Sequence, residues 1–63
     1  MLHLHRKEAG DAALDFSEAI HLAPTVSDFY RERSLAYALL GKDDLATRDY
    51  QVATTLRARQ VSP

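Results

Sequence analysis

The apolar and small residues of the chain recur at helical spacing, beginning with the segment from Asp11 to Leu22. Positions separated by four, three and one residues lie mostly on one face of a helix, and here they are Ala12, Phe16, Ala19, Ile20 and Leu22. Asp11 follows a glycine and is expected to be the N-cap. Pro24 biases Ala23 away from helical geometry, so the helix is predicted to end before this proline.

A second helix is expected to start near Ser27 or Asp28. Thr25 and Asp28 have the spacing of a capping box. Aromatic and small residues then recur at intervals of four and three, at Tyr30, Ser34 and Tyr37. Gly41 is predicted to end this helix, because glycine readily adopts the left-handed conformation of a helix C-terminus.

A third helix is expected to begin at Asp43 or Asp44, because acidic side chains stabilise the N-terminal end of a helix dipole. Residues spaced by four and three share one face, namely Ala46, Tyr50, Ala53 and Leu56. Residues 1–6 are compatible with the last turns of a further helix. No segment alternates polar and apolar residues with a period of two, so the sequence predicts an all-α fold with three main helices.

The sequence repeats itself after a shift of thirty-four residues. Both copies read Ala-x-x-Asp-aromatic-x-x-Ala-x-x-Leu. The equivalent pairs are Ala12 and Ala46, Asp15 and Asp49, Phe16 and Tyr50, Ala19 and Ala53, and Leu22 and Leu56. A fixed period of this length is typical of repeat proteins, in which stacked units share a continuous core.

A period of thirty-four with two helices per unit resembles the tetratricopeptide repeat (TPR) family. The second copy supplies the family motif at Tyr30, Ser34, Tyr37, Gly41, Ala46, Tyr50 and Ala53. The first copy supplies Ala12, Phe16, Ala19 and Pro24. The chain departs from the pattern at three positions, where Arg33 replaces a leucine, Lys7 replaces a glycine and Ala58 replaces a proline.

The resemblance implies antiparallel helix-turn-helix repeats, an α-solenoid fragment of about one and a half to two units. The chain 1–63 would then be a single module, with residues 1–24 ending the first repeat and residues 25–60 forming the second. Small residues would let the helices approach closely. Phe16, Tyr37 and Tyr50 would fill the wedge between helices.

The resemblance also implies a partner-binding groove lined by the first helix of the repeat. By this correspondence the groove residues are Asp28, Arg31, Leu35, Ala38 and Leu39. Some members hold a C-terminal carboxylate in a clamp of basic residues and asparagines. Here Leu35 stands in place of the clamp asparagine, so a protein or peptide surface fits this mixed groove better than a carboxylate. The alternative is that these residues merely face solvent or another repeat.

Composition and charge restrict the classes of partner. Eight basic against nine acidic residues give a net charge of -1, whereas nucleic-acid binders usually carry a basic stripe. No apolar run approaches the ~20 residues of a membrane span, and the first six residues lack the apolar core of a signal peptide. We therefore expect a cytoplasmic protein that binds neither nucleic acid nor membrane.

The sequence offers no credible catalytic or metal-binding site. There is no cysteine, which excludes thiolate catalysis and disulfides. His3 and His5 would point about 200° apart on a helix, and His21 lies elsewhere. Asp43 and Asp44 are explained by their place at a helix start. We therefore predict no metal, no cofactor and no enzymatic activity.

Three hypotheses on function follow from the sequence. The first is a non-catalytic protein–protein interaction or scaffold module. The second is a self-association element that forms a homo-oligomer when isolated, because repeat units bury a continuous core only by stacking. The third is a regulatory repeat of a larger enzyme whose catalytic domain lies outside this chain.

Overall fold

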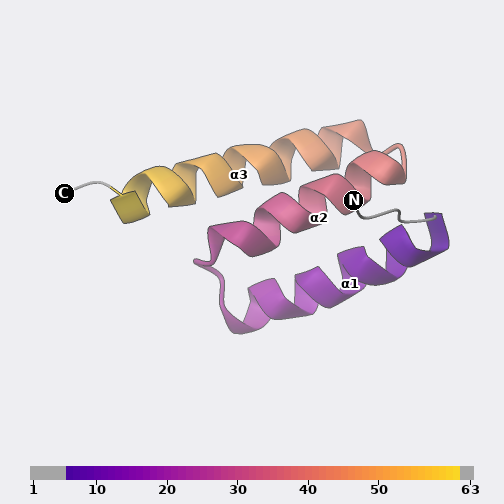
Figure 1. Cartoon of the computed structure of the whole chain (residues 1–63), viewed down its shortest axis with the longest axis horizontal. Helices are drawn as coiled ribbons and strands as arrows, with labels where there is room; N and C mark the ends of the chain where they lie inside the picture. The colour runs from indigo at the N-terminus through magenta and orange to yellow at the C-terminus, as the bar shows by residue number, and fades with distance from the viewer. Residues whose placement is uncertain (1–5, 62–63) are drawn as a thin grey trace.

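The computed structural model of the chain describes residues 6–61, which form three helices joined by short turns (Figure 1). Helix α1 spans Arg6–Leu22, α2 spans Ser27–Leu39 and α3 spans Asp43–Val61. No strand occurs within this range. The expectation of an all-α fold with three main helices is confirmed.

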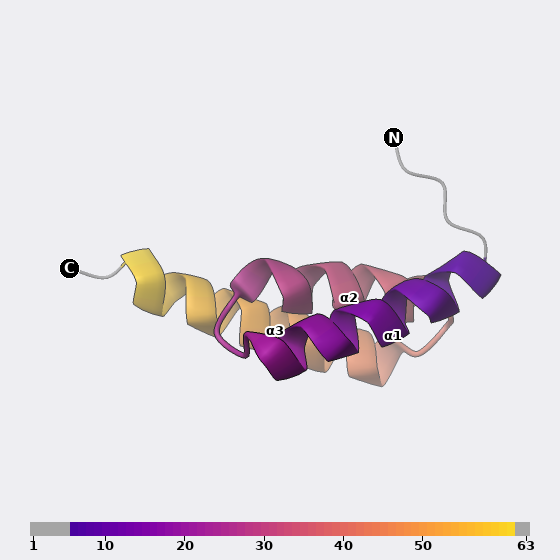
Figure 2. The same cartoon turned by 90° about the horizontal axis from the view of Figure 1, so that it is seen from below.

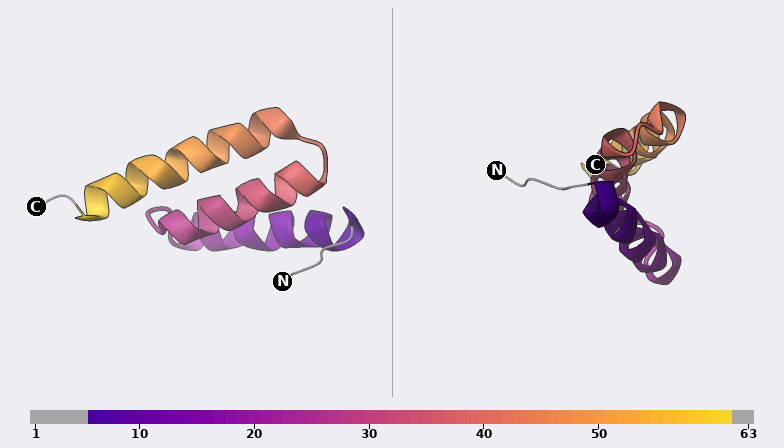
Figure 3. Two further views of the ribbon diagram at one scale, coloured as in Figure 1. Left: turned by 45° about the horizontal axis from the view of Figure 1, so that its top comes forward. Right: turned by 90° about the vertical axis from the view of Figure 1, so that its right-hand side faces the viewer.

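Helix α2 lies between the other two helices. All three run along the long axis of the molecule, and consecutive helices are antiparallel (Figures 1 and 2). Helix α2 packs against both α1 and α3, whereas no Cα atoms of α1 and α3 in residues 6–61 approach within 8 Å. Seen along the helices, α1 and α3 diverge on opposite sides of α2 (Figure 3).

Helix α1 begins earlier than the sequence predicts. It starts at Arg6, so Gly10 lies inside the helix and the prediction of an N-cap at Asp11 is wrong. A glycine inside a helix costs roughly 1 kcal/mol relative to alanine. Burial of Ala9, which is 0% exposed and packs near Ala13 and Ala36, favours continuing the helix through this turn. A further helix was predicted at residues 1–6, but residues 1–5 lie outside the described residues.

Helix α2 begins at Ser27, as predicted, but without the expected capping box. Its N-cap is Val26, which forms no side-chain cap hydrogen bond. The backbone N–H of Phe29 donates to the carbonyl of Val26 instead, at 3.2 Å. The hydroxyl of Tyr30 donates to the carbonyl of Pro24 at 3.0 Å and ties the preceding turn to the helix.

The turn from α2 to α3 confirms the predicted role of Gly41. Its φ of 76° lies in the left-handed region, which only glycine adopts without strain. The N–H of Gly41 donates to the carbonyl of Ala38 at 3.1 Å, and that of Lys42 donates to Tyr37 at 2.9 Å. These two bonds form a Schellman motif. Helix α3 then starts at Asp43, as predicted.

The two glycines are expected to respond to alanine with opposite signs. Gly41→Ala should destabilise the fold by about 1–2 kcal/mol, because a Cβ is unfavourable in the left-handed conformation. Gly10→Ala should stabilise it by roughly 0.5–1 kcal/mol, since a Cβ there meets no atom within 4 Å. Thermal melts followed by circular dichroism check both variants. An unchanged melting temperature for Gly41→Ala would contradict the assigned cap.

Alanines form most of the buried core. Ala9, Ala13 and Ala36 cluster where α1 crosses α2, and Ala53 is buried on α3. Among the described residues no large side chain is fully buried. Large apolar side chains instead remain on the surface, at Leu14, Leu22, Leu35, Leu39, Leu45 and Tyr50. Close helix packing therefore depends on small residues, and several apolar side chains have no partner within the fold.

Equivalent aromatic residues of the repeat lie in different environments. Phe16 is half-buried, with its ring centroid 6.5 Å from that of Phe29, and Tyr37 is also half-buried. Tyr50 is 60% exposed, so the prediction that it fills a wedge between helices is wrong in this chain. The reason is that Phe16 packs against Phe29 of α2, whereas Tyr50 borders an open groove between α2 and α3.

Candidate functional site

The residues predicted to bind a partner form one exposed stripe on α2. Asp28, Arg31, Leu35, Ala38 and Leu39 are all exposed. Together with Glu32 they span an arc of about 120° on a regular helix. Leu35 and Leu39 are 56% and 47% exposed, respectively. The stripe therefore places two large apolar side chains in contact with solvent.

Helix α1 and this stripe enclose the first of two grooves. Its α2 wall contains Glu32, Leu35, Ala38 and Leu39, and its α1 wall contains Ala12, Asp15 and Phe16. The volume is about 620 Å³. We call it the acidic groove, because its lining holds two carboxylates and no cation.

Helix α3 and the opposite side of the stripe enclose the second groove. Its α2 wall contains Ser27, Asp28 and Arg31, and its α3 wall contains Tyr50, Ala53, Thr54, Arg57 and Ala58. The volume is about 460 Å³. We call it the basic groove, because its lining holds two guanidinium groups and one carboxylate.

The five predicted residues are thus divided between the two grooves. Asp28 and Arg31 line the basic groove, whereas Leu35, Ala38 and Leu39 line the acidic groove. The walls from α1 and α3 were absent from the prediction. Phe16 and Tyr50 occupy equivalent places in the thirty-four-residue repeat, and this periodicity was the signal that could have indicated a groove on each side of α2.

The ion pairs on the stripe all involve Arg31. Arg31 lies 3.7 Å from a carboxylate oxygen of Asp28 and 3.6 Å from one of Glu32. Exposed pairs of this kind contribute at most about 1 kcal/mol. Within residues 6–61, neither Asp15 nor Arg57 forms an ion pair. One carboxylate in the acidic groove and one guanidinium in the basic groove are therefore available to a partner.

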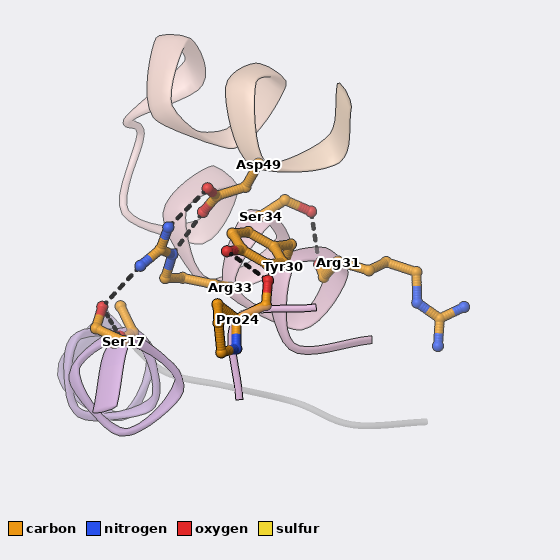
Figure 4. A network of polar contacts seen from close by, with 8 residues as sticks. Ser17, Pro24, Tyr30, Arg31, Arg33, Ser34 and Asp49 are labelled. Carbon is orange, nitrogen blue, oxygen red and sulfur yellow. Dashed lines mark hydrogen bonds and ion pairs between the residues drawn. The ribbon is translucent and has the colours of Figure 1, made fainter. Parts of the chain in front are cut away.

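A separate polar cluster connects all three helices on the other side of α2 (Figure 4). The Arg33 guanidinium donates two hydrogen bonds to the Asp49 carboxylate, at 2.7 and 2.8 Å. It donates a third to the hydroxyl of Ser17 on α1, at 3.0 Å. Ser17 in turn donates to the carbonyl of Ala13 at 2.8 Å. A single side chain of α2 thereby holds both α1 and α3.

The surroundings of Arg33 favour the charged form of its guanidinium group. The hydrogen bond to Asp49 raises the pKa of Arg33 above its ordinary value, although partial burial opposes this. The side chains of Arg33 and Asp49 are only 19% and 6% exposed. The guanidinium carbon also lies 5.7 Å from the ring centroid of Tyr30 and 5.5 Å from that of Tyr37. Cation–π contacts of this kind stabilise a partly desolvated cation.

The Arg33 cluster, formed by Arg33, Asp49 and Ser17, is a structural brace that joins the three helices by hydrogen bonds. Each buried nitrogen or oxygen atom in the side chains of Arg33, Asp49 and Ser17 has a hydrogen-bond partner. The same holds for every other buried polar side-chain atom in residues 6–61. The Ser17 hydroxyl donates to a backbone carbonyl, so no base lies in place to accept its proton. Asp49 therefore has a structural role, as the acceptor of both hydrogen bonds that join α2 to α3 through Arg33.

Residues 6–61 contain neither a cluster of metal ligands nor a helix able to span a membrane. No group of three or more histidine, cysteine, aspartate or glutamate side chains is arranged there to hold a metal ion. His21 is exposed, and His3 and His5 lie outside the described residues. None of the helices in this range combines the length and apolar character needed to cross a membrane.

Comparison with known proteins gives no match. No protein-family model, curated protein or solved structure matches this chain. The resemblance to tetratricopeptide repeats therefore rests on the motif residues and the thirty-four-residue period alone.

Proposed function

We propose that this chain is a non-catalytic protein–protein interaction module built from TPR-like repeats. The observation that carries the proposal is the exposure of Leu35 and Leu39 in a groove whose opposite wall contains Ala12 and Phe16. Contiguous apolar surface of this kind, rimmed by polar groups, is typical of binding sites for other proteins. The carboxylates of Asp15 and Glu32 supply such a rim.

The arrangement of the helices supports a repeat interpretation of the module. Antiparallel neighbours with α2 between α1 and α3 are compatible with a solenoid whose units are residues 1–24 and 25–60. The thin alanine core agrees with units that complete their burial by stacking on other surfaces. The stripe on α2 would then be the surface that receives the partner.

A matched pair of leucine variants tests this function. Leu35→Ser with Leu39→Ser should abolish capture of the partner, because the two anchors of the acidic groove are lost. Leu14→Ser with Leu22→Ser is the control, since these leucines are 71% and 77% exposed and line neither groove. Proteins retained by immobilised wild-type chain are identified by mass spectrometry, and each purified candidate is titrated against both variants by calorimetry.

The two variants must behave differently if the proposal is correct. Binding that survives the control and disappears with the groove variant supports it. A partner that binds the groove variant as tightly as wild type would contradict it.

A further inference from the structure

The acidic groove between α1 and α2 combines a large apolar lining with two carboxylates. The apolar lining consists of Phe16, Leu35 and Leu39 with two alanines, and the carboxylates are those of Asp15 and Glu32. The volume is about 620 Å³, whereas an apolar cavity of only about 150 Å³ already accepts a benzene ring. The groove can therefore receive more than one apolar side chain of a partner.

Carboxylates continue from this groove along the exposed face of α1. The exposed acidic residues of α1 recur at intervals of three and four, so they share an arc of about 80° on a regular helix. We call them the acidic row, and they are Glu8, Asp11, Asp15 and Glu18. None of them forms an ion pair with another residue in the range 6–61. Asp15 belongs both to the row and to the groove lining, so the row borders the groove on its α1 side.

The nearby cations lie at the edges of this surface. Arg31 lines the basic groove on the opposite side of the stripe and lies 3.6 Å from a carboxylate oxygen of Glu32. Arg6 and Lys7 begin α1, and Arg6 donates a hydrogen bond to the carbonyl of Leu40 at 3.5 Å. The rest of the α1 side therefore carries negative charge that no cation of the described residues pairs.

We propose that the acidic groove binds a basic amphipathic helix of another protein. Apolar side chains on one face of that helix enter the groove, which is a common mode of recognition between a helix and an apolar groove. Lysine or arginine side chains beside this face meet Asp15 and the other carboxylates of the acidic row. The inference rests on the proposed function, because it names the class of partner that the same surface receives.

The walls of the groove favour a helical partner over an extended one. Both walls are helices, whose backbone N–H and carbonyl groups are already hydrogen-bonded within each helix. An extended peptide would gain no backbone hydrogen bonds from them. Because buried backbone groups must be paired, a partner that enters this groove has to satisfy its own backbone, as a helix does.

The charge of the groove favours a different protein over a second copy. A two-fold interface uses the same patch on both subunits. Two copies that met through the acidic groove would therefore bring carboxylates against carboxylates. A helix with cations beside its apolar face avoids this conflict, because opposite charges across an interface steer association and select among partners.

Two synthetic peptides test the class of partner. Both have about 18 residues, or roughly 27 Å as a helix, with leucines spaced to form one apolar face. The polar face carries lysine in the first peptide and glutamate in the second. Each peptide is labelled with a fluorophore and titrated with wild-type chain at about 50 mM salt, where exposed charges are weakly screened. Binding is measured as fluorescence anisotropy.

The lysine peptide should bind wild type at least about tenfold more tightly than the glutamate peptide. Leu35→Ser with Leu39→Ser should abolish binding of the lysine peptide, because the apolar anchors of the groove are lost. Raising the salt to about 500 mM should weaken binding to wild type, since salt screens the carboxylates.

Neutralising variants separate the groove carboxylates from the overall charge. Asp15→Asn with Glu32→Gln should raise the dissociation constant of the lysine peptide about tenfold. Asp43→Asn with Asp44→Asn is the control, because it changes the net charge equally at exposed positions that line neither groove. The control should bind the lysine peptide as wild type does. Circular dichroism should show wild-type helicity in both variants.

Every other outcome would overturn this inference, and each has its own meaning for the proposed function. Equal or tighter binding of the glutamate peptide, lost in the leucine variant, would keep the groove as a binding site but remove its preference for a basic partner. Lysine-peptide binding that survives the leucine or the carboxylate variant would place the peptide on another surface. If neither peptide binds and light scattering shows a dimer, a second copy occupies the groove. If neither peptide binds a monomeric chain, the partner is not a basic helix, and the capture experiment still tests the proposed function.

Discussion

Asp49→Ala is expected to unfold the chain at room temperature. The substitution removes both carboxylate oxygens that accept from Arg33 and leaves a guanidinium whose side chain is only 19% exposed. Removing one partner of a buried ion pair costs about 3–5 kcal/mol. A domain of this size holds in total only about 3–5 kcal/mol. Circular dichroism at about 25 °C should therefore show a loss of helical signal relative to wild type.

The repeat itself supplies the control for this experiment. Asp15 is the equivalent of Asp49 in the other copy, but it is exposed and forms no ion pair among the described residues. Asp15→Ala should change stability by no more than about 0.5 kcal/mol. Adding Arg33→Leu to Asp49→Ala should restore folding, because the unpaired cation is then gone. An Asp49→Ala variant that melts like wild type would show that the brace contributes little.

Local chemistry was sufficient to predict most helix boundaries. The sequence predicted helix ends at or next to Ser27, Gly41 and Asp43. These signals are local, because a glycine in a turn or an acidic residue at a helix start influences only the neighbouring residues. The start of α1 was predicted wrongly because it depends on tertiary packing. Gly10 is a local signal against helix, and burial of Ala9 against α2 outweighs it. The contact between Ala9 and α2 could not be predicted from the sequence alone.

The environments of the repeated residues could not be predicted from the repeat. The period implied that Asp15 and Asp49 would have the same surroundings, and likewise Phe16 and Tyr50. The structure buries Asp49 at 4% exposure and leaves Asp15 exposed. The difference arises because only Asp49 faces Arg33, a residue recognised in the sequence as a departure from the family pattern.

The candidate site was predicted in part. The resemblance to tetratricopeptide repeats identified five residues of α2, and the structure shows that all five are exposed on one face of the helix. The resemblance could not identify the walls that face this stripe, because they belong to α1 and α3. The division into an acidic and a basic groove depends on how these helices pack on α2 and therefore required the structure.

Ala36→Leu is expected to cause the second large loss of stability. Ala36 is 1% exposed and packs with Ala9 and Ala13 at the crossing of α1 and α2. A leucine side chain there must force the two helices apart or adopt a strained rotamer. Overpacking of this kind costs typically about 1–3 kcal/mol. For a domain of this size we expect the melting temperature to fall on the order of 10 °C.

A leucine at Ala38 provides the matched comparison on the same helix. Ala38 is exposed in the acidic groove, so Ala38→Leu changes helix propensity as Ala36→Leu does but places the new side chain in open space. Both variants are melted at low micromolar concentration, where self-association contributes least. Ala38→Leu should melt close to wild type, because substitutions at exposed positions usually change stability by no more than about 0.5 kcal/mol. Equal melting temperatures for the two variants would mean that α1 and α2 can separate at little cost, and that small side chains do not determine their spacing.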